Sequence, residues 1–110
     1  MKEQQPAEYI TYTPATDVME QENGWSLCLD VPGAANELLE INVDDNILKI
    51  KADTTLQEHG MTVRFERSFQ LSDEVNAGGI AAVLKNGQLK LTLPKAEAAK
   101  PHKIKVLTAE

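Results

Sequence analysis

The chain has 110 residues, 42% of them hydrophobic and 25% charged, with a formal net charge of −6 at pH 7. This length and composition predict one globular domain with a single core. The acidic balance, without a basic cluster, disfavours nucleic acid and anionic membranes as partners, because both bind to a concentrated positive surface. No apolar run approaches the ~18 residues that span a bilayer, and the polar start of the chain is unlike a secretory signal.

The N-terminal third predicts an arm and two strands. Residues 1–13 are polar with scattered apolar positions, which is typical of a short flexible arm. A first edge strand is expected over residues 15–20, and the Glu-Asn-Gly sequence at residues 22–24 favours a turn. A second, half-buried strand follows, because polar residues then alternate with the apolar residues Trp25, Leu27, Leu29 and Val31.

Asp44, Asp45 and Asn46 separate two further predicted strands. The two aspartates are interpreted as turn residues, which satisfy local backbone groups, rather than as paired catalytic carboxylates. Residues 53–61 are mostly polar and predict a connecting loop. The apolar positions that alternate in the strand before the turn and in the strand after it are Leu39, Ile41 and Val43, and Leu48, Ile50 and Ala52.

Three more strands complete the predicted domain. Asn86-Gly87 joins the last two as a tight hairpin turn, and Pro94 ends the sheet. About seven short strands with period-two alternation predict an all-β, antiparallel β-sandwich over residues 14–95. The apolar faces of the three strands carry Phe65, Phe69 and Leu71 together with Arg67, then Ile80, Ala82 and Leu84, then Leu89, Leu91 and Leu93.

Arg67 lies on the same predicted face as Phe65 and Phe69. A guanidinium group on an apolar face is costly unless it is paired with a carboxylate or with carbonyl oxygens. Two interpretations remain equally open. Either the side chain reaches water near a sheet edge, or it forms an ion pair within the domain or across a subunit contact.

The candidate catalytic and metal-binding residues form no familiar pattern. The chain has neither a nucleophile elbow nor a Gly-rich phosphate loop. Cys28 lies in mid-strand and is interpreted as a buried structural thiol; as the single cysteine it favours a reducing compartment, with the cytoplasm as the expected location. With His59 and His102 it lacks metal-ligand spacing, so we expect no metal, no cofactor and no enzymatic activity.

Ile104 and Val106 are the apolar residues of interest in the polar C-terminal extension, residues 96–110. In an extended chain, residues two apart point the same way, so their side chains form adjacent knobs while Lys105 points away. A polar linker of about ten residues lets these knobs reach a groove on the same subunit or on another. The alternative is a final strand or a frayed tail whose apolar residues are incidental.

Several motifs occur in the order found in the α-crystallin domain of small heat-shock proteins, which the chain resembles over residues 14–106. Residues 31–33 and 41–50 resemble the first half of that domain, and residues 65–71 resemble its arginine-bearing strand. The tail motif I-x-I/V of the family is matched by Ile104 and Val106. The A-x-L-x-x-G-x-L motif is matched by Ala82, Leu84, Gly87 and Leu89.

The A-x-L-x-x-G-x-L motif also has a physical interpretation. Gly87 permits the positive φ that a tight hairpin turn requires. Ala82 is expected to be small because the two sheets approach closely there. Leu84 and Leu89 are expected to lie opposite each other in the hairpin and to face the core.

The resemblance implies an immunoglobulin-like sandwich and ATP-independent chaperoning, in which partly unfolded client proteins are held before they aggregate. It also implies that the tail knobs dock in a groove between two strands, link subunits, and expose client-binding surface on release. Covering a sheet edge in this way makes physical sense, since an open edge promotes aggregation. The groove lining that the resemblance implies is Leu39, Ile41, Val43, Ile80, Ala82 and Leu84.

Two departures from the family change what is expected of the assembly. Bacterial and plant members have a long excursion after the strand ending near Ala52, and they exchange its strand with a dimer partner. In this chain only residues 53–64 connect the two flanking strands, and the arm is short. We therefore expect a dimer or small oligomer, or a monomer in equilibrium with one, rather than a large cage. The alternative function is a non-chaperone interaction module or co-chaperone-like adaptor. An enzyme or ligand-binding sandwich would require convergent polar residues, and the sequence offers no such cluster.

Overall fold

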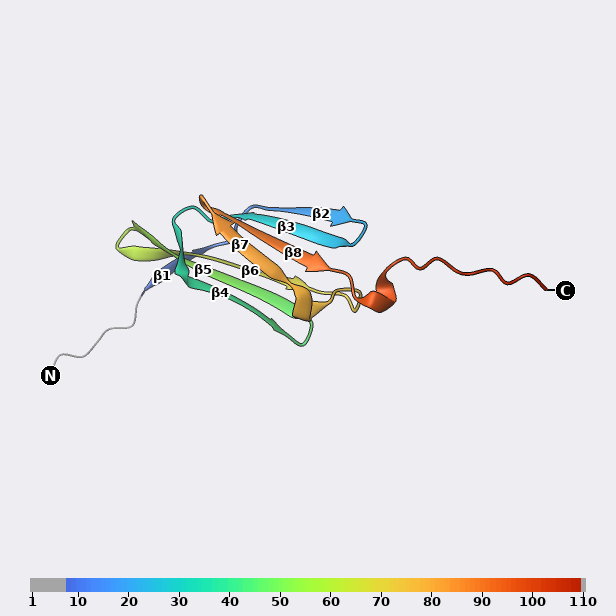
Figure 1. Ribbon diagram of the computed structural model, residues 1–110. Coiled ribbons are helices and arrows are strands. Elements are labelled where there is room, and N and C mark those ends of the chain that lie inside the picture. The colour runs from blue at the N-terminus through green and yellow to red at the C-terminus, as the bar shows by residue number, and fades with distance from the viewer. Residues whose placement is uncertain (1–7, 110) are drawn as a thin grey trace.

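Two four-stranded sheets form a β-sandwich in the computed structural model, which describes residues 8–109 (Figure 1). The strand orders are β1-β6-β5-β4 and β2-β3-β8-β7. Neighbouring strands are antiparallel except β1 and β6, so the predicted antiparallel sandwich is confirmed. The strands are β1 (Tyr9–Tyr12), β2 (Thr16–Gln21), β3 (Gly24–Asp30), β4 (Ala34–Asp44), β5 (Ile47–Glu58), β6 (Met61–Gln70), β7 (Ala81–Lys85) and β8 (Gln88–Pro94).

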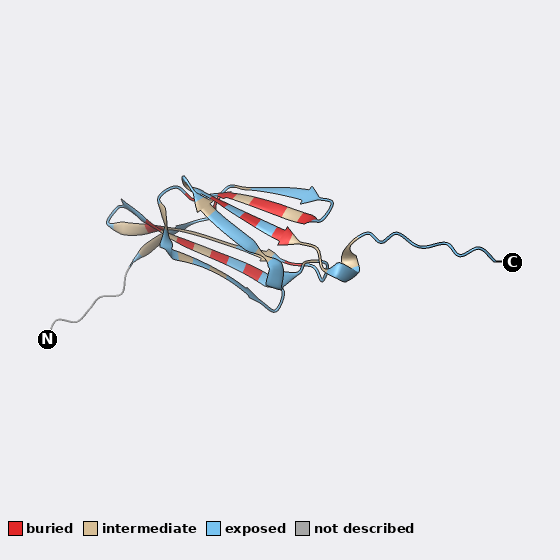
Figure 2. Cartoon of the chain, viewed as in Figure 1, coloured by how far each residue is buried: buried red, intermediate tan, exposed pale blue. Residues whose placement is uncertain are grey.

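The core fills the space between the sheets and comes mainly from β3, β5 and β8. Buried residues alternate with more exposed ones along β5 and β8, which confirms the alternation expected there (Figure 2). In β3 the expected alternation holds from Leu27 onward, but Ser26 is buried and Trp25 is only half-buried. Burying each leucine or isoleucine side chain contributes about 1.5–3 kcal/mol to the free energy of unfolding. The buried cluster comprises Leu27, Leu29, Val31, Leu48, Ile50, Ala52, Leu71, Leu89, Leu91 and Leu93.

Three of the tight turns that join consecutive antiparallel strands have positive φ at both central residues. Positive φ at both central residues is the pattern of a type I′ turn, whose twist matches that of the flanking strands. The turns expected at Asp44-Asp45-Asn46 and at Asn86-Gly87 are therefore confirmed. The central pairs and their φ values are Asp45 and Asn46 (50° and 62°), His59 and Gly60 (52° and 78°), and Asn86 and Gly87 (51° and 75°).

The loop predicted over residues 53–61 is wrong, because this segment is the distal part of a β-hairpin. β5 continues to Glu58 and β6 begins at Met61, and these two residues are paired. Inside the hairpin, the Thr54 hydroxyl donates a hydrogen bond of 2.8 Å to the carbonyl oxygen of Val63. The last four residues of β5 are exposed, so the apolar alternation that identifies a half-buried strand is absent from them.

The flexible arm expected over residues 1–13 is wrong for Tyr9–Tyr12, which form β1; residues 1–7 lie outside the described residues. β1 pairs in parallel with residues 62–65 of β6, and the Tyr12 ring lies 6.3 Å from the Phe65 ring, centroid to centroid. The pairing residues are about 50 positions apart in the chain. A local polar pattern therefore gave no sign of this strand.

The C-terminal tail leaves the sandwich directly after β8. Two backbone hydrogen bonds hold its first residues: the Lys95 N–H donates to the Asn23 carbonyl oxygen and the Ala96 N–H to that of Glu74. A short 3₁₀ helix, η2 (Glu97–Ala99), follows, and another, η1 (Ala77–Gly79), lies between β6 and β7. Residues 100–109 form neither helix nor strand and extend away from the sandwich (Figure 1).

Gly87→Ala and Gly60→Ala form a matched pair that tests how closely the β7–β8 turn packs. Both glycines have similar positive φ, so each change costs about 1 kcal/mol of conformational strain. A Cβ at Gly87 would lie 3.2 Å from Pro32 Cα, whereas a Cβ at Gly60 would meet nothing within 4 Å. We expect Gly87→Ala to lower the free energy of unfolding by about 1 kcal/mol more than Gly60→Ala in urea denaturation. Equal losses would contradict a packing role for Gly87.

Candidate functional site

The residues predicted to line a docking groove lie on the two edge strands β4 and β7, except Ile80, which directly precedes β7. β4 is hydrogen-bonded only to β5, and β7 only to β8, among the strands of residues 8–109. The outer edge of each strand therefore keeps backbone donors and acceptors for a further extended segment. Figure 1 shows both strands on the same side of the sandwich.

The six side chains of the predicted lining differ in burial. Leu39, Ile41, Ile80 and Leu84 are half-buried and pack against the core, while Val43 and Ala82 are exposed. The expectation that Ala82 fills a close approach of the two sheets is wrong: it pairs with Leu91 on β8 but stays open to solvent, because β7 is an edge strand. Leu84 lies opposite Leu89 and packs on the core, as expected.

The predicted tail knobs lie far from these strands in the structure. Ile104 and Val106 are 83% and 87% exposed, and Leu107, which the motif-based reasoning left out, is 78% exposed. Figure 2 shows residues 101–109 in the colour of exposed residues. The apolar Val-Leu dipeptide at residues 106–107 was the available sequence signal for Leu107. Three neighbouring apolar side chains without cover are unfavourable in water, so the tail is suited to bind another surface.

Arg67 is half-buried on β6, two residues beyond the part of β6 that pairs with β1. Its Nη1 donates a hydrogen bond of 3.4 Å to the Pro14 carbonyl oxygen, and its guanidinium carbon lies 4.9 Å from the centroid of the Phe69 ring. Among residues 8–109, no carboxylate forms an ion pair with it. Within one chain the arrangement therefore favours the edge interpretation, with a backbone carbonyl and a ring as partners.

The outer face of the β1-β6-β5-β4 sheet is covered by paired charges. Arg64 Nε and Nη2 bind the two carboxylate oxygens of Asp53 at 2.5 and 3.0 Å, and the Arg64 guanidinium stacks 3.6 Å from the Tyr9 ring centroid. This hydrogen bonding raises the pKa of Arg64, so the pair stays charged. Such a face offers little apolar surface for docking. The further ion pairs on it are Lys49–Glu66 and Lys51–Glu40.

A hydrogen bond ties β1 to the end of the β5–β6 hairpin. The Tyr12 hydroxyl donates to Glu58 Oε2 at 2.7 Å. This hydrogen bond raises the pKa of Tyr12, with smaller contributions from burial and from the negative charge of Glu58. All three causes favour the neutral phenol, so the contact is retained at neutral pH and lost in strongly alkaline solution.

The candidate nucleophile and metal ligands lie apart. Cys28 is half-buried rather than fully buried, because it alternates with the core residues Leu27 and Leu29 and lies on the outer side of β3. His59 is in the β5–β6 turn, and His102 Nε2 lies 3.0 Å from the Glu97 carbonyl oxygen. In the part of the chain that the structure describes, no three His, Cys, Asp or Glu residues gather as metal ligands. The helices found there are also too short to cross a membrane.

A sandwich with the free edge strands β4 and β7 and an apolar tail has the features of a protein-interaction module of the small heat-shock type. The model of the Hsp20/alpha crystallin family matches residues 17–107. Small heat shock protein C2 of Rickettsia felis is 35% identical over 103 residues, covering 84% of this chain and 67% of that protein. Small heat shock protein C4 of the same organism is 30% identical, covering 86% and 64%. The chain belongs to the Hsp20/alpha crystallin family.

Solved structures agree with this assignment. A small heat-shock protein from Xylella fastidiosa, described as having a distinct high order structure, superposes with a TM-score of 0.67 at 30% identity, covering 88% of this chain and 98% of that one. The chain spans about two thirds of the length of the two Rickettsia relatives. Small heat-shock proteins are chaperones of the stress response, not enzymes, and they typically self-associate.

Ionisation of Tyr12 provides a pH test of the hydrogen bond that ties β1 to the β5–β6 hairpin. The raised pKa means that the Tyr12–Glu58 contact contributes to stability fully below pH 10, the ordinary pKa, and loses that contribution as pH rises through the pKa in the folded protein. We expect Glu58→Gln to move the Tyr12 pKa back toward 10. NMR titration of the Tyr12 phenol carbon measures this change. Tyr9 is the internal control, and an unchanged Tyr12 titration would contradict the contact.

Proposed function

We propose that this protein is an ATP-independent holdase, which binds partly unfolded client proteins and prevents their aggregation. The observation that carries the proposal is the joint exposure of the tail residues Ile104 and Val106 and of the apolar edge strands β4 and β7 in a member of a chaperone family. Unfolded clients expose apolar side chains and unpaired backbone groups. The apolar tail residues can bind the side chains, and the free edges of β4 and β7 can hydrogen-bond to the backbone.

In this proposal, the tail of one copy docks along β4 and β7 of another. An extended segment places Ile104 and Val106 on one side, about 7 Å apart, and can hydrogen-bond to a free strand edge. Leu39, Ile41, Ile80 and Leu84 offer half-buried apolar surface, and Val43 and Ala82 leave the site open. The small Ala82 side chain is useful here because it leaves room for an incoming side chain.

The energetics suit a reversible contact. Burying one isoleucine and one valine contributes about 3–6 kcal/mol in total, and association entropy opposes this gain. Docking of a single tail is therefore weak, and several tails are needed to hold an assembly together. Weak individual contacts allow tails to release and expose client-binding surface when a client is present.

We propose a dimer or small oligomer in the cytoplasm. The β5–β6 hairpin turns back at His59 and Gly60, which leaves no excursion for strand exchange between those strands. Arg67, which has carbonyl and aromatic partners within its own chain, is available for an ion pair across a subunit contact. The single cysteine fits a reducing compartment.

An adaptor function is the second candidate, and the same hairpin favours it. A subunit that lacks the exchanged strand of its relatives can serve as a partner of another small heat-shock protein rather than as an independent chaperone. Such an adaptor would form a stoichiometric complex with one protein and would leave varied unfolding clients unprotected.

The decisive experiment combines client protection with a tail variant. We expect the protein to suppress light scattering from a heated model client near stoichiometric ratios without nucleotide. Ile104→Ala with Val106→Ala should remove most of this protection and reduce the oligomer size in light scattering, because two docking side chains are lost. Lys105→Ala is the matched control, since Lys105 points away from the knobs. A folded wild-type protein that protects no client would favour the adaptor.

A further inference from the structure

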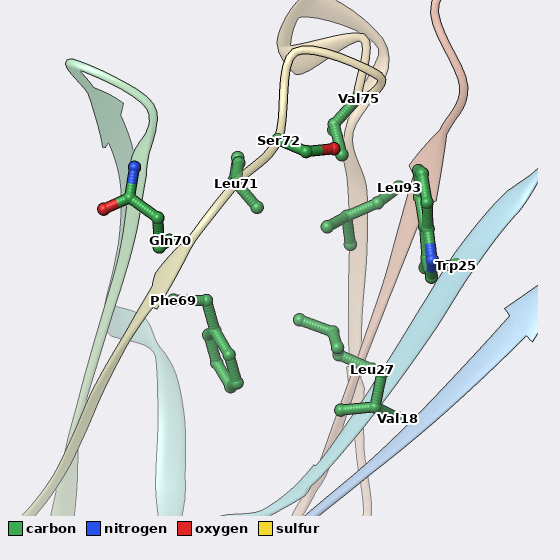
Figure 3. Close-up of a pocket in the computed structure, with 9 residues that line it drawn as sticks. All are labelled: Val18, Trp25, Leu27, Phe69, Gln70, Leu71, Ser72, Val75 and Leu93. Atoms are coloured by element: carbon green, nitrogen blue, oxygen red, sulfur yellow. The ribbon is translucent and has the colours of Figure 1, made fainter. Parts of the chain in front are cut away.

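An apolar cavity of about 240 Å³ opens on the side of the sandwich opposite to β4 and β7. It is called the β2–β6 cavity below. Figure 3 shows side chains of β2, β3, β6 and β8 directed toward this common space. Its volume holds one or two aliphatic side chains. The lining residues are Val18, Trp25, Leu27, Phe69, Gln70, Leu71, Ser72, Val75 and Leu93.

The cavity has an entrance because β1 is short. β1 pairs with β6 only as far as Phe65, so residues 66–70 of β6 have no strand on that side among the described residues. On the facing sheet, β2 is an edge strand, and Val18 at the cavity is 59% exposed. An incoming segment can therefore reach the apolar lining without displacing any described strand.

The tail begins beside this cavity. Leu93 lines it, and two residues later Lys95 Nζ lies 5.5 Å from the centroid of the Trp25 ring. The Ala96 N–H donates a hydrogen bond of 2.7 Å to the carbonyl oxygen of Glu74, which is adjacent to the lining residue Val75. The eight residue-to-residue steps from Ala96 to Ile104 span up to about 26 Å when extended, which is enough to double back.

Charge around the entrance is complementary to the tail. The tail carries lysines at residues 103 and 105, which alternate with Ile104 and Val106, whereas Lys100 is already paired with Glu97 at 2.7 Å. The acidic residues next to lining positions are in no ion pair within residues 8–109. Attraction between the two at moderate ionic strength favours the folded-back tail. These acidic residues are Asp17, Asp73 and Glu74.

We propose that the tail has a second docking site on its own domain: residues 104–107 fold back and place apolar side chains in the β2–β6 cavity. Because the tail is covalently attached at the cavity, its effective concentration there is in the millimolar range, which offsets a modest intrinsic affinity. Folding back removes the tail from the reach of other copies. This closed state is defined by contacts within one chain and does not depend on client protection.

Trp25 provides the measurement, because it lines the cavity and is the single tryptophan of the chain. The reference is the variant Ile104→Ser with Val106→Ser and Leu107→Ser. We expect acrylamide to quench Trp25 about twofold less in the full chain than in this variant, since a docked tail shields the indole. The difference should persist on dilution, because the contact is intramolecular.

Two further variants locate the contact. Val18 and Met19 are equally exposed neighbours on β2, at 59% each, but only Val18 lines the cavity. Val18→Lys should abolish the protection of Trp25, whereas Met19→Lys should retain it; circular dichroism confirms that both are folded. Leu84→Ser, on β7 at the other side of the sandwich, should also retain it.

Three outcomes would overturn the proposal: equal quenching in the full chain and the serine variant, equal effects of Val18→Lys and Met19→Lys, or protection that disappears on dilution. If Val18→Lys does not fold, a spin label on the tail provides an independent measurement. A spin label at Thr108→Cys in a Cys28→Ser background should broaden the Trp25 indole N–H signal at low protein concentration. An unbroadened signal would overturn the proposal independently of client binding.

Discussion

Burial of the inner faces of β3, β5 and β8 against each other is the interaction on which the rest of the structure depends. Leu29, Ile50 and Leu89 are almost completely buried there. The two sheets hold together through these side chains, since among the strands of residues 8–109 none pairs with a strand of the other sheet. A sandwich of this kind has two open sides, and half-buried apolar residues of the edge strands remain accessible at both.

The two open sides are covered differently, and the difference follows from the chain ends. On one side, β1 covers the first half of β6 through backbone pairing and through its tyrosines, and the β2–β6 cavity begins where β1 ends. On the other side, β4 and β7 have no cover within the described residues. The tail leaves the domain next to the cavity, with the Ala96 N–H bound to the Glu74 carbonyl oxygen, and carries apolar residues suited to either side.

Period-two alternation predicted the strands whose one face is buried and the turns between them, such as Asn86-Gly87. It gave no sign of β1, whose four residues are half-buried or exposed without alternation, nor of the distal part of the β5–β6 hairpin, where the last four residues of β5 are all exposed. Ala82 was misjudged for a related reason: alternation shows which face a residue is on, but not whether its strand lies at an edge.

The same apolar residues of the tail cannot occupy the cavity of their own domain and a neighbour's β4–β7 edges at once. A molecule with a folded-back tail therefore donates no tail to a neighbour, and the apparent affinity of tail docking between subunits is reduced in proportion to the fraction of tails that are free. Lys103 and Lys105 make this fraction sensitive to salt, because the acidic entrance of the cavity attracts them only while screening is weak. Assembly should then strengthen as ionic strength rises, the opposite of what lysine-driven docking between subunits would produce.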